Sequence, residues 1–297
     1  MSLVIILSCL LAFTACGRSK GGGGGAGAVS SSNAINAVNP QVAVDGSGNG
    51  IAVWVEEHKL GNTLAYQLTA RHYKAGSGGT AQRVTSIATA RLFVRPEMAM
   101  DAGGNAIVVW RQHDSSIKAI RYDTATDTWG TEQTIGSGDP PDVAVNASGN
   151  AVAVWKKGKN SFANRFDATT GTWGTEQQIG SQPVSGGFFS PPAIGIDAAG
   201  NAIAVWLQDD GGFSWRLYAN RFDAVAGNWG TQTRIESGSL SPSLPEIAMS
   251  AAGDAIAVWG NKGMMAMPTV MTRPPGPGGR RQQLSPAASV WVRRRSR

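Results

Sequence analysis

Cysteine is almost absent from this chain of 297 residues, which contains only Cys9 and Cys16. Because both lie near the N-terminus, the sequence after them can form no disulfide and offers no thiol for catalysis or for zinc binding. Histidine is equally scarce, and His58, His72 and His113 do not have the spacing of metal ligands. We therefore expect a folded body with no bound metal and no cofactor.

Sustained helical periodicity is also missing. Apolar residues nowhere keep the spacing of an amphipathic helix, and Gly, Thr and Asn interrupt the chain densely. The apolar run at residues 3–15 is too short to cross a bilayer as a helix. The sequence therefore predicts an all-β domain.

The most informative feature that is present is a repeated phrase. Each copy consists of a Pro, a short alternating strand, a turn that contains Gly, and a second strand that ends in Val-Trp. Alternating apolar residues on both sides of such a turn predict a β-hairpin. The copies begin about 45 to 56 residues apart, a period typical of four-stranded propeller blades. They lie at residues 40–54, 96–110, 141–155, 192–206 and 245–259.

The complete repeats continue with a second, more polar hairpin. It begins with an Arg-containing strand, as at residues 163–167, and runs through a turn to Trp-Gly-Thr, as at Trp173. We therefore expect an all-β β-propeller of five four-stranded blades over residues 38–260, with the last blade incomplete. The fifth blade is expected to lack its third strand, unless residues 288–292 provide it. Residues 34–38 are expected to be its fourth strand and to close the ring.

These repeats resemble those of bacterial secreted or lipoprotein β-propellers. Residues 166–173, Phe-Asp-Ala-Thr-Thr-Gly-Thr-Trp, are loosely similar to the Asp-box of sialidase-like propellers. In those proteins the Asp-box is a structural turn on the face away from the active site. The resemblance therefore implies an architecture and does not imply catalysis.

The pattern divides each blade into two ends. The two stereotyped turns of a repeat are expected at one end, and the variable loops that follow each Val-Trp are expected at the other, where binding residues usually lie. The Trp of each Val-Trp is expected to pack between blades, whereas Trp215 belongs to a variable loop. The candidate ligand-binding residues are the acids, histidine and aromatics of these loops: Glu56, Glu57, His113, Asp114, Asp209, Asp210, Phe213 and Trp215.

Three catalytic or metal interpretations are weaker than structural ones. The repeated Arg could clamp a carboxylate as in sialidase-like enzymes, but its fixed strand position favours pairing with neighbouring residues. The turn acids could suggest calcium, but one carboxylate per turn is too few for a cage, and turn capping is favoured. The loop acids could form a glycosidase pair, but no such constellation is recognisable. We therefore assign no catalytic residue.

The two ends of the chain differ from the repeats. Residues 1–16 resemble a lipoprotein-type signal peptide that would leave Cys16 acylated, and residues 17–37 resemble a Gly/Ser-rich tether. The expected location is the bacterial cell envelope, with a lipid anchor on the outer membrane or cell surface, or alternatively secretion. Residues 261–297 are rich in Pro, Gly and Arg and are expected to be a disordered tail, which is either the out-of-frame end of a longer repeat array or a genuine basic extension.

The tail also explains the net charge of +6. Most of the basic excess lies in residues 260–297, which contain no acid, while the repeats at residues 30–259 carry a net negative charge. A nucleic-acid-binding body is therefore not expected. The function predicted is a non-catalytic binding module for a glycan or a protein. A glycosidase or sialidase-like hydrolase and a purely structural surface protein are the alternatives.

Overall fold

Five antiparallel sheets make up the protein, as shown by a computed structural model that describes residues 34–74, 77–86, 95–181, 190–211, 215–236, 242–261 and 264–271. The strands of each sheet follow one another in chain order. The first sheet consists of β1 (Ala34–Val44), β2 (Gly50–Leu60), β3 (Thr63–Lys74) and β4 (Ser77–Arg83).

The next three sheets share one plan, in which two short strands pair side by side with the third strand and together take the fourth position. The second sheet contains β5 (Glu97–Met100), β6 (Ala106–Arg111), β7 (Ser116–Asp123), β8 (Thr128–Trp129) and β9 (Gln133–Ser137). The third contains β10 (Asp139–Val145), β11 (Ala151–Lys157), β12 (Asn160–Asp167), β13 (Thr172–Trp173) and β14 (Gln177–Gly180). The fourth contains β15 (Ala193–Ile196), β16 (Ala202–Asp209), β17 (Trp215–Asp223), β18 (Asn228–Trp229) and β19 (Thr233–Arg234).

The fifth sheet corrects two expectations. It contains β20 (Pro242–Met249), β21 (Ala255–Asn261) and β22 (Met264–Met271), so residues that the sequence assigned to the tail supply its third strand. Residues 34–38 are not its fourth strand, because they extend β1 and pair with β2, with Val38 opposite Val55. Residues 288–292 lie outside the described part of the chain.

The first hairpin of the first four blades is closed by the predicted Asp or Asn turn, and in the fifth blade Ser250 takes the same place. In the second blade, the Asp101 carboxylate accepts hydrogen bonds from the backbone N–H groups of Gly103 and Asn105, both at 2.9 Å. Its second oxygen accepts the Asn105 amide at 2.8 Å, and Gly104 takes the positive φ of 86° that the reversal needs. The acid therefore caps the turn, as the sequence predicted.

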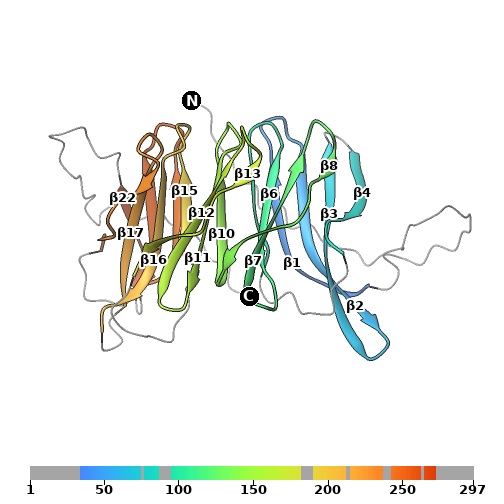
Figure 1. Ribbon diagram of the computed structural model, residues 1–297, viewed down its shortest axis with the longest axis horizontal. Helices are drawn as coiled ribbons and strands as arrows, with labels where there is room; N and C mark the ends of the chain where they lie inside the picture. Colours follow the sequence, from blue (N-terminus) through green and yellow to red (C-terminus); the bar gives the residue numbers. More distant parts are fainter. Residues whose placement is uncertain are drawn as a thin grey trace, which may run out of the picture. The chain divides into compact units, whose positions relative to one another are not determined.

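The two turns of one blade lie together at the same end. The Asn150 side chain of the first turn accepts a hydrogen bond from the Ala168 N–H of the second turn, and Asn201 and Ala224 make the same bond in the next blade. The variable loops therefore lie at the opposite end, where β11 turns into β12 and β16 turns into β17 (Figure 1).

Successive sheets pack on one another through apolar side chains. The cluster between the first and second sheets joins Val53 and Leu68 to Val108 and Trp110, and the same arrangement recurs at the three following boundaries. Contacts between the first strands of neighbouring sheets, such as β5 with β10 and β10 with β15, accompany this packing. The sheets are therefore the five blades of a β-propeller, and the fold prediction is confirmed.

Candidate functional site

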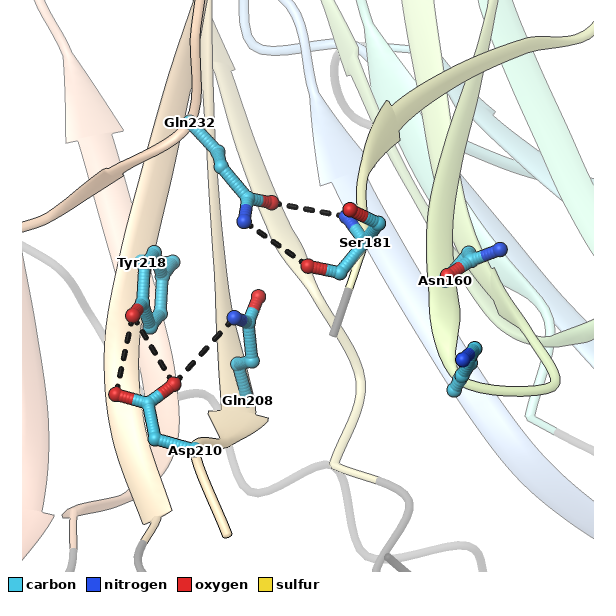
Figure 2. Close-up of a pocket in the computed structure, with 7 residues that line it drawn as sticks. Asn160, Ser181, Gln208, Asp210, Tyr218 and Gln232 are labelled. Carbon is cyan, nitrogen blue, oxygen red and sulfur yellow. Dashed lines mark hydrogen bonds between the residues drawn. The ribbon is translucent and has the colours of Figure 1, made fainter. Parts of the chain in front are cut away.

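A polar pocket of about 620 Å³ lies between the third and fourth blades. Two of the predicted variable loops contribute to it, with Asn160 at the start of β12 and Asp210 directly after β16. Figure 2 shows the two blades facing each other across this space. The residues that line it are Lys159, Asn160, Ser181, Gln208, Asp210, Tyr218 and Gln232.

The Asp210 carboxylate is held in place by its own blade. It accepts hydrogen bonds from the Tyr218 hydroxyl at 3.0 Å and from the Gln208 amide at 3.4 Å (Figure 2). Burial raises the pKa of Tyr218, and the bond to the Asp210 carboxylate raises it further. The phenol therefore stays a hydrogen-bond donor at neutral pH, and the carboxylate keeps a fixed orientation.

A second polar bridge crosses the boundary between the blades. Gln232 of the fourth blade accepts a bond from the Ser181 N–H and donates one to the Ser181 carbonyl, both at 2.9 Å (Figure 2). The segment after β14 is thus tied to the neighbouring blade by a pair of bonds. The side of the pocket formed by Ser181 and Gln232 is therefore held in place by these two hydrogen bonds.

Other predicted site residues lie elsewhere. Glu56 is buried on β2, where it accepts a bond from the Trp54 indole at 3.2 Å and lies 3.4 Å from His58. Glu57, on the other side of the strand, accepts a bond from the Asn36 amide at 3.1 Å. Both acids therefore bind groups of their own blade.

The structure places the remaining candidates in two separate loops. Asp114 caps its turn by accepting the Ser116 N–H and hydroxyl, beside the exposed His113. Asp209 is buried next to the exposed Asp210 and accepts the Gly211 N–H at 2.9 Å. Trp215 lies opposite Asp209 and packs against the core, and Phe213 lies outside the described residues. Of the predicted site residues that the structure describes, only Asp210 lines the pocket.

Three of the repeated Arg, namely Arg71, Arg121 and Arg165, have structural partners, as the sequence predicted. Arg121 forms an ion pair with Asp123 at 2.8 Å, and Arg71 donates to the Gly79 carbonyl at 2.6 Å. The Arg165 guanidinium lies 4.2 Å from the ring centre of Phe222 in the next blade. The Arg side chains therefore stabilise single blades and one blade boundary.

A set of three carboxylates was missed by the sequence reasoning. Burial raises the pKa of Asp142 to about 7, bonds from the Ile194 and Val143 N–H groups oppose that rise, and the charges of Glu97 and Glu246 add to it. Burial also raises the pKa of Glu97. A signal did exist, because each of these three acids directly follows the Pro that opens its repeat.

Neither a metal cluster nor a membrane-spanning helix is found in the described part of the chain. No group of at least three His, Cys, Asp or Glu side chains there could hold a metal ion. No helix there is long and apolar enough to cross a membrane. Cys16, the predicted signal and residues 17–33 of the predicted tether lie outside the described residues. Residues 34–37, which the sequence assigned to the tether, belong instead to β1.

Comparison with known proteins gives distant structural likenesses only. No family model and no curated protein matches the sequence. A protein of unknown function from Dyadobacter fermentans is similar, with a TM-score of 0.49, 10% identity, and coverage of 80% of this chain and 79% of that one. An α-L-arabinanase from Penicillium chrysogenum has a TM-score of 0.48, 14% identity and coverage of 79% and 77%. The β-propeller domain of the Trilobed protease from Pyrococcus furiosus has a TM-score of 0.47, 10% identity and coverage of 80% and 68%.

Proposed function

We propose that this protein is a non-catalytic binding module whose pocket between the third and fourth blades takes a glycan. The observation that carries the proposal is the composition of the lining, in which amide, hydroxyl and carboxylate groups converge from two blades. Sugars present many hydroxyl groups, each able to donate and accept a hydrogen bond. A site that offers both donors and acceptors therefore suits them.

The pocket is also pre-organised for this role. Asp210 is fixed by Tyr218 and Gln208, and Gln232 is fixed by Ser181, so these side chains lose little freedom when a ligand binds. Asp210 is exposed and can accept bonds from a pair of sugar hydroxyls, while Asn160 and Lys159 can donate from the facing blade. One carboxylate without a facing second acid favours binding over glycosidic hydrolysis at this pocket.

A glycan array followed by calorimetry on the strongest hit tests the proposal. Asp210→Asn should weaken binding about tenfold, because it removes a charge-assisted acceptor. Asp114→Asn is the matched control, since Asp114 is a loop acid outside the pocket. An array without hits, or equal losses for both variants, would overturn the assignment of a glycan to this pocket.

Hydrolysis of glycosides is a second candidate function, favoured by the carboxylates Glu97, Asp142 and Glu246. A glycosidase needs one carboxylic acid that stays protonated near neutral pH and a second, ionised carboxylate. Asp142, with a pKa raised by burial to about 7, meets the first requirement, and its neighbours could meet the second. This activity would use the acids that follow the first Pro of each repeat, and the polar pocket would remain a separate binding site.

Turnover of fluorogenic glycosides separates the two functions. If the protein hydrolyses one of them and Asp142→Asn abolishes the activity while Asp210→Asn retains catalysis, the binding-only proposal is wrong. If no glycoside is hydrolysed while the array gives hits sensitive to Asp210→Asn, the hydrolase candidate is rejected. Asp114→Asn again serves as the control in both assays.

We also propose that Cys16 carries a lipid anchor that holds the propeller at the bacterial cell envelope. The support is the apolar run at residues 3–15, which ends at Ala15 and is followed directly by Cys16. Metabolic labelling with a fatty-acid analogue should label the wild-type chain, and Cys16→Ser should lose the label and the membrane association. A labelled Cys16→Ser chain, or an unlabelled wild type, would contradict the anchor.

A further inference from the structure

Each blade boundary in this protein buries the same two surfaces. We call one the leading face, which carries Val53 in the first blade, and the other the trailing face, which carries Val108 and Trp110 in the second. At each boundary the leading face of one blade packs on the trailing face of the next. The equivalent pairs at the later boundaries are Val109 with Ala153 and Trp155, Val154 with Ala204 and Trp206, and Val205 with Ala257 and Trp259.

Among the described residues, no blade packs on the trailing face of the first blade. Its strand β1 exposes Val42 and Val44 at 70% and 63% of their surface. The residues at the same repeat positions in the fourth blade, Ile194 and Ile196, are only 5% and 8% exposed. Trp54 is likewise half-buried, whereas its four equivalents in the later blades are buried. An apolar surface built for packing is therefore uncovered.

The leading face of the fifth blade is uncovered in the same way. Ile256 on β21 is 49% exposed, whereas its equivalents Ile51, Ile107, Val152 and Ile203 are at most 6% exposed. The difference cannot come from the side chain, because four of these five residues are Ile and all are apolar. It arises because the fifth blade is the last described blade, and no further described blade packs on its leading face.

We propose that these two faces bind each other between two copies of this chain. The trailing face of the first blade of one copy would pack on the leading face of the fifth blade of another, continuing the boundary that each chain already forms four times. The partner is identified as a second copy of the chain because each chain carries both of the faces that pack together at its own blade boundaries. Burying valine and isoleucine side chains at such a boundary is favourable, because it removes their apolar surface from water.

The contact is heterologous, because the two faces are different surfaces. A heterologous contact leaves one free face at each end of the assembly, so it adds further copies unless rotation closes it into a ring. The full-length chain should therefore form dimers and larger species whose proportion rises with concentration.

Charged substitutions on each face provide the test. Val44→Asp places a charge on the trailing face of the first blade, and Ile256→Asp places one on the leading face of the fifth blade. Each charge should prevent packing at its own face. Because both side chains are exposed in the single chain, the new charge stays hydrated there and should not disturb the fold. Each variant of the full chain, measured alone by sedimentation velocity, should be monomeric. Mixed together they should form a one-to-one dimer that grows no further, because each partner keeps one intact face. Val225→Asp is the matched control, since Val225 is 98% exposed on the turn after β17 and belongs to neither face.

The outcomes decide the proposal in each case. A wild-type chain that stays monomeric at all concentrations overturns it, and indicates that the two faces close within one chain or stay open. Association that survives both variants, or that Val225→Asp also abolishes, places the contact elsewhere. Circular dichroism checks that the variants are folded, and Val42→Lys replaces Val44→Asp if the latter is not.

Discussion

The Trp155 indole lies directly against the Cα of Gly136, across the boundary between the second and third blades. A Cβ atom at Gly136 would overlap the indole ring. The same relationship joins Trp206 to Gly180 at the next boundary. The Trp155 N–H also donates to Glu176 at 3.1 Å, and Glu176 accepts the Ser137 N–H of the preceding blade. The Trp155 ring thus fills the space that the absence of a side chain at Gly136 leaves open.

Gly136→Ala should therefore destabilise the protein strongly. The added methyl group must displace a fully buried indole, and overpacking of this kind costs about 1 to 3 kcal/mol. Gly130→Ala is the matched control, because a Cβ there meets only the Arg121 carbonyl oxygen at 3.5 Å, an ordinary contact. Urea unfolding of both variants checks the prediction, and equal midpoints would contradict it.

Asp101 should tolerate Asn but not Ala. Asp101→Ala removes the acceptor for two backbone N–H groups and one side-chain amide, which should cost about 1 to 2 kcal/mol. Asp101→Asn should cost less, because the third blade already uses Asn146 for the same two backbone bonds. Thermal unfolding with and without calcium measures both effects. A stability that depends on added calcium would contradict the capping role.

The turns and strands could be predicted because their causes are local. The pattern of Asp or Asn, Gly and Asn is complete within five residues, and the Val-Trp phrase marks the strand that follows. Strand β22 could not be predicted in this way, because its sequence has neither the Arg of the other third strands nor an alternating pattern, and it contains Pro268. Its pairing with β21, which places Asn261 opposite Met264, therefore appears only in the structure.

The pocket was only partly predictable for the same reason. The sequence indicated the loop that contains Asp210, but two neighbouring acids alternate sides, and nothing local shows that Asp209 is the buried one. Ser181 and Gln232 come from segments far apart in the chain that meet only across a blade boundary. Repeat equivalence would have identified Glu97 and Asp142, had the residue after each Pro been compared.

Lys156 predicts a stability that rises at alkaline pH. Burial lowers the pKa of its ammonium from 10.5 to about 7, and its one bond is to the Leu207 carbonyl at 3.0 Å. Between these pH values the unfolded chain binds a proton that the folded chain lacks, so the free energy of unfolding should increase with pH. Lys156→Met should remove this pH dependence. Its free energy of unfolding should exceed that of the wild type by the largest amount near pH 6, where the wild-type ammonium is charged although it is buried.

Chemical denaturation at pH 6, 8 and 10 measures this effect. Lys157→Met is the control, because Lys157 is exposed and pairs with Glu176 at 2.7 Å, so its substitution should give no comparable change with pH. If the difference between Lys156→Met and the wild type stays constant from pH 6 to 10, the buried ammonium does not contribute as described.

Asp142 has the opposite dependence. Its pKa is raised from 3.8 to about 7 by burial, and the charges of Glu97 and Glu246 add to the rise. Between these pH values the folded chain binds a proton that the unfolded chain lacks, so stability is highest at acid pH and falls as the pH rises toward 7. Above pH 7 the cost of the buried charge is constant.

Asp142→Asn should consequently raise the free energy of unfolding at pH 8 by about 1 to 3 kcal/mol, since a neutral amide avoids the buried charge while its oxygen can still accept a backbone N–H. At pH 4 the variant should equal the wild type or fall slightly below it, because the wild-type acid is then protonated. Asp223→Asn is the control in the opposite sense: bonds from the Ala226 and Val225 N–H groups lower the Asp223 pKa, so this variant should lose stability at pH 8. A destabilised Asp142→Asn at pH 8 would mean that the carboxylate's bonds to Ile194 and Val143 outweigh its desolvation, which would also remove the argument for Asp142 as a neutral acid in hydrolysis.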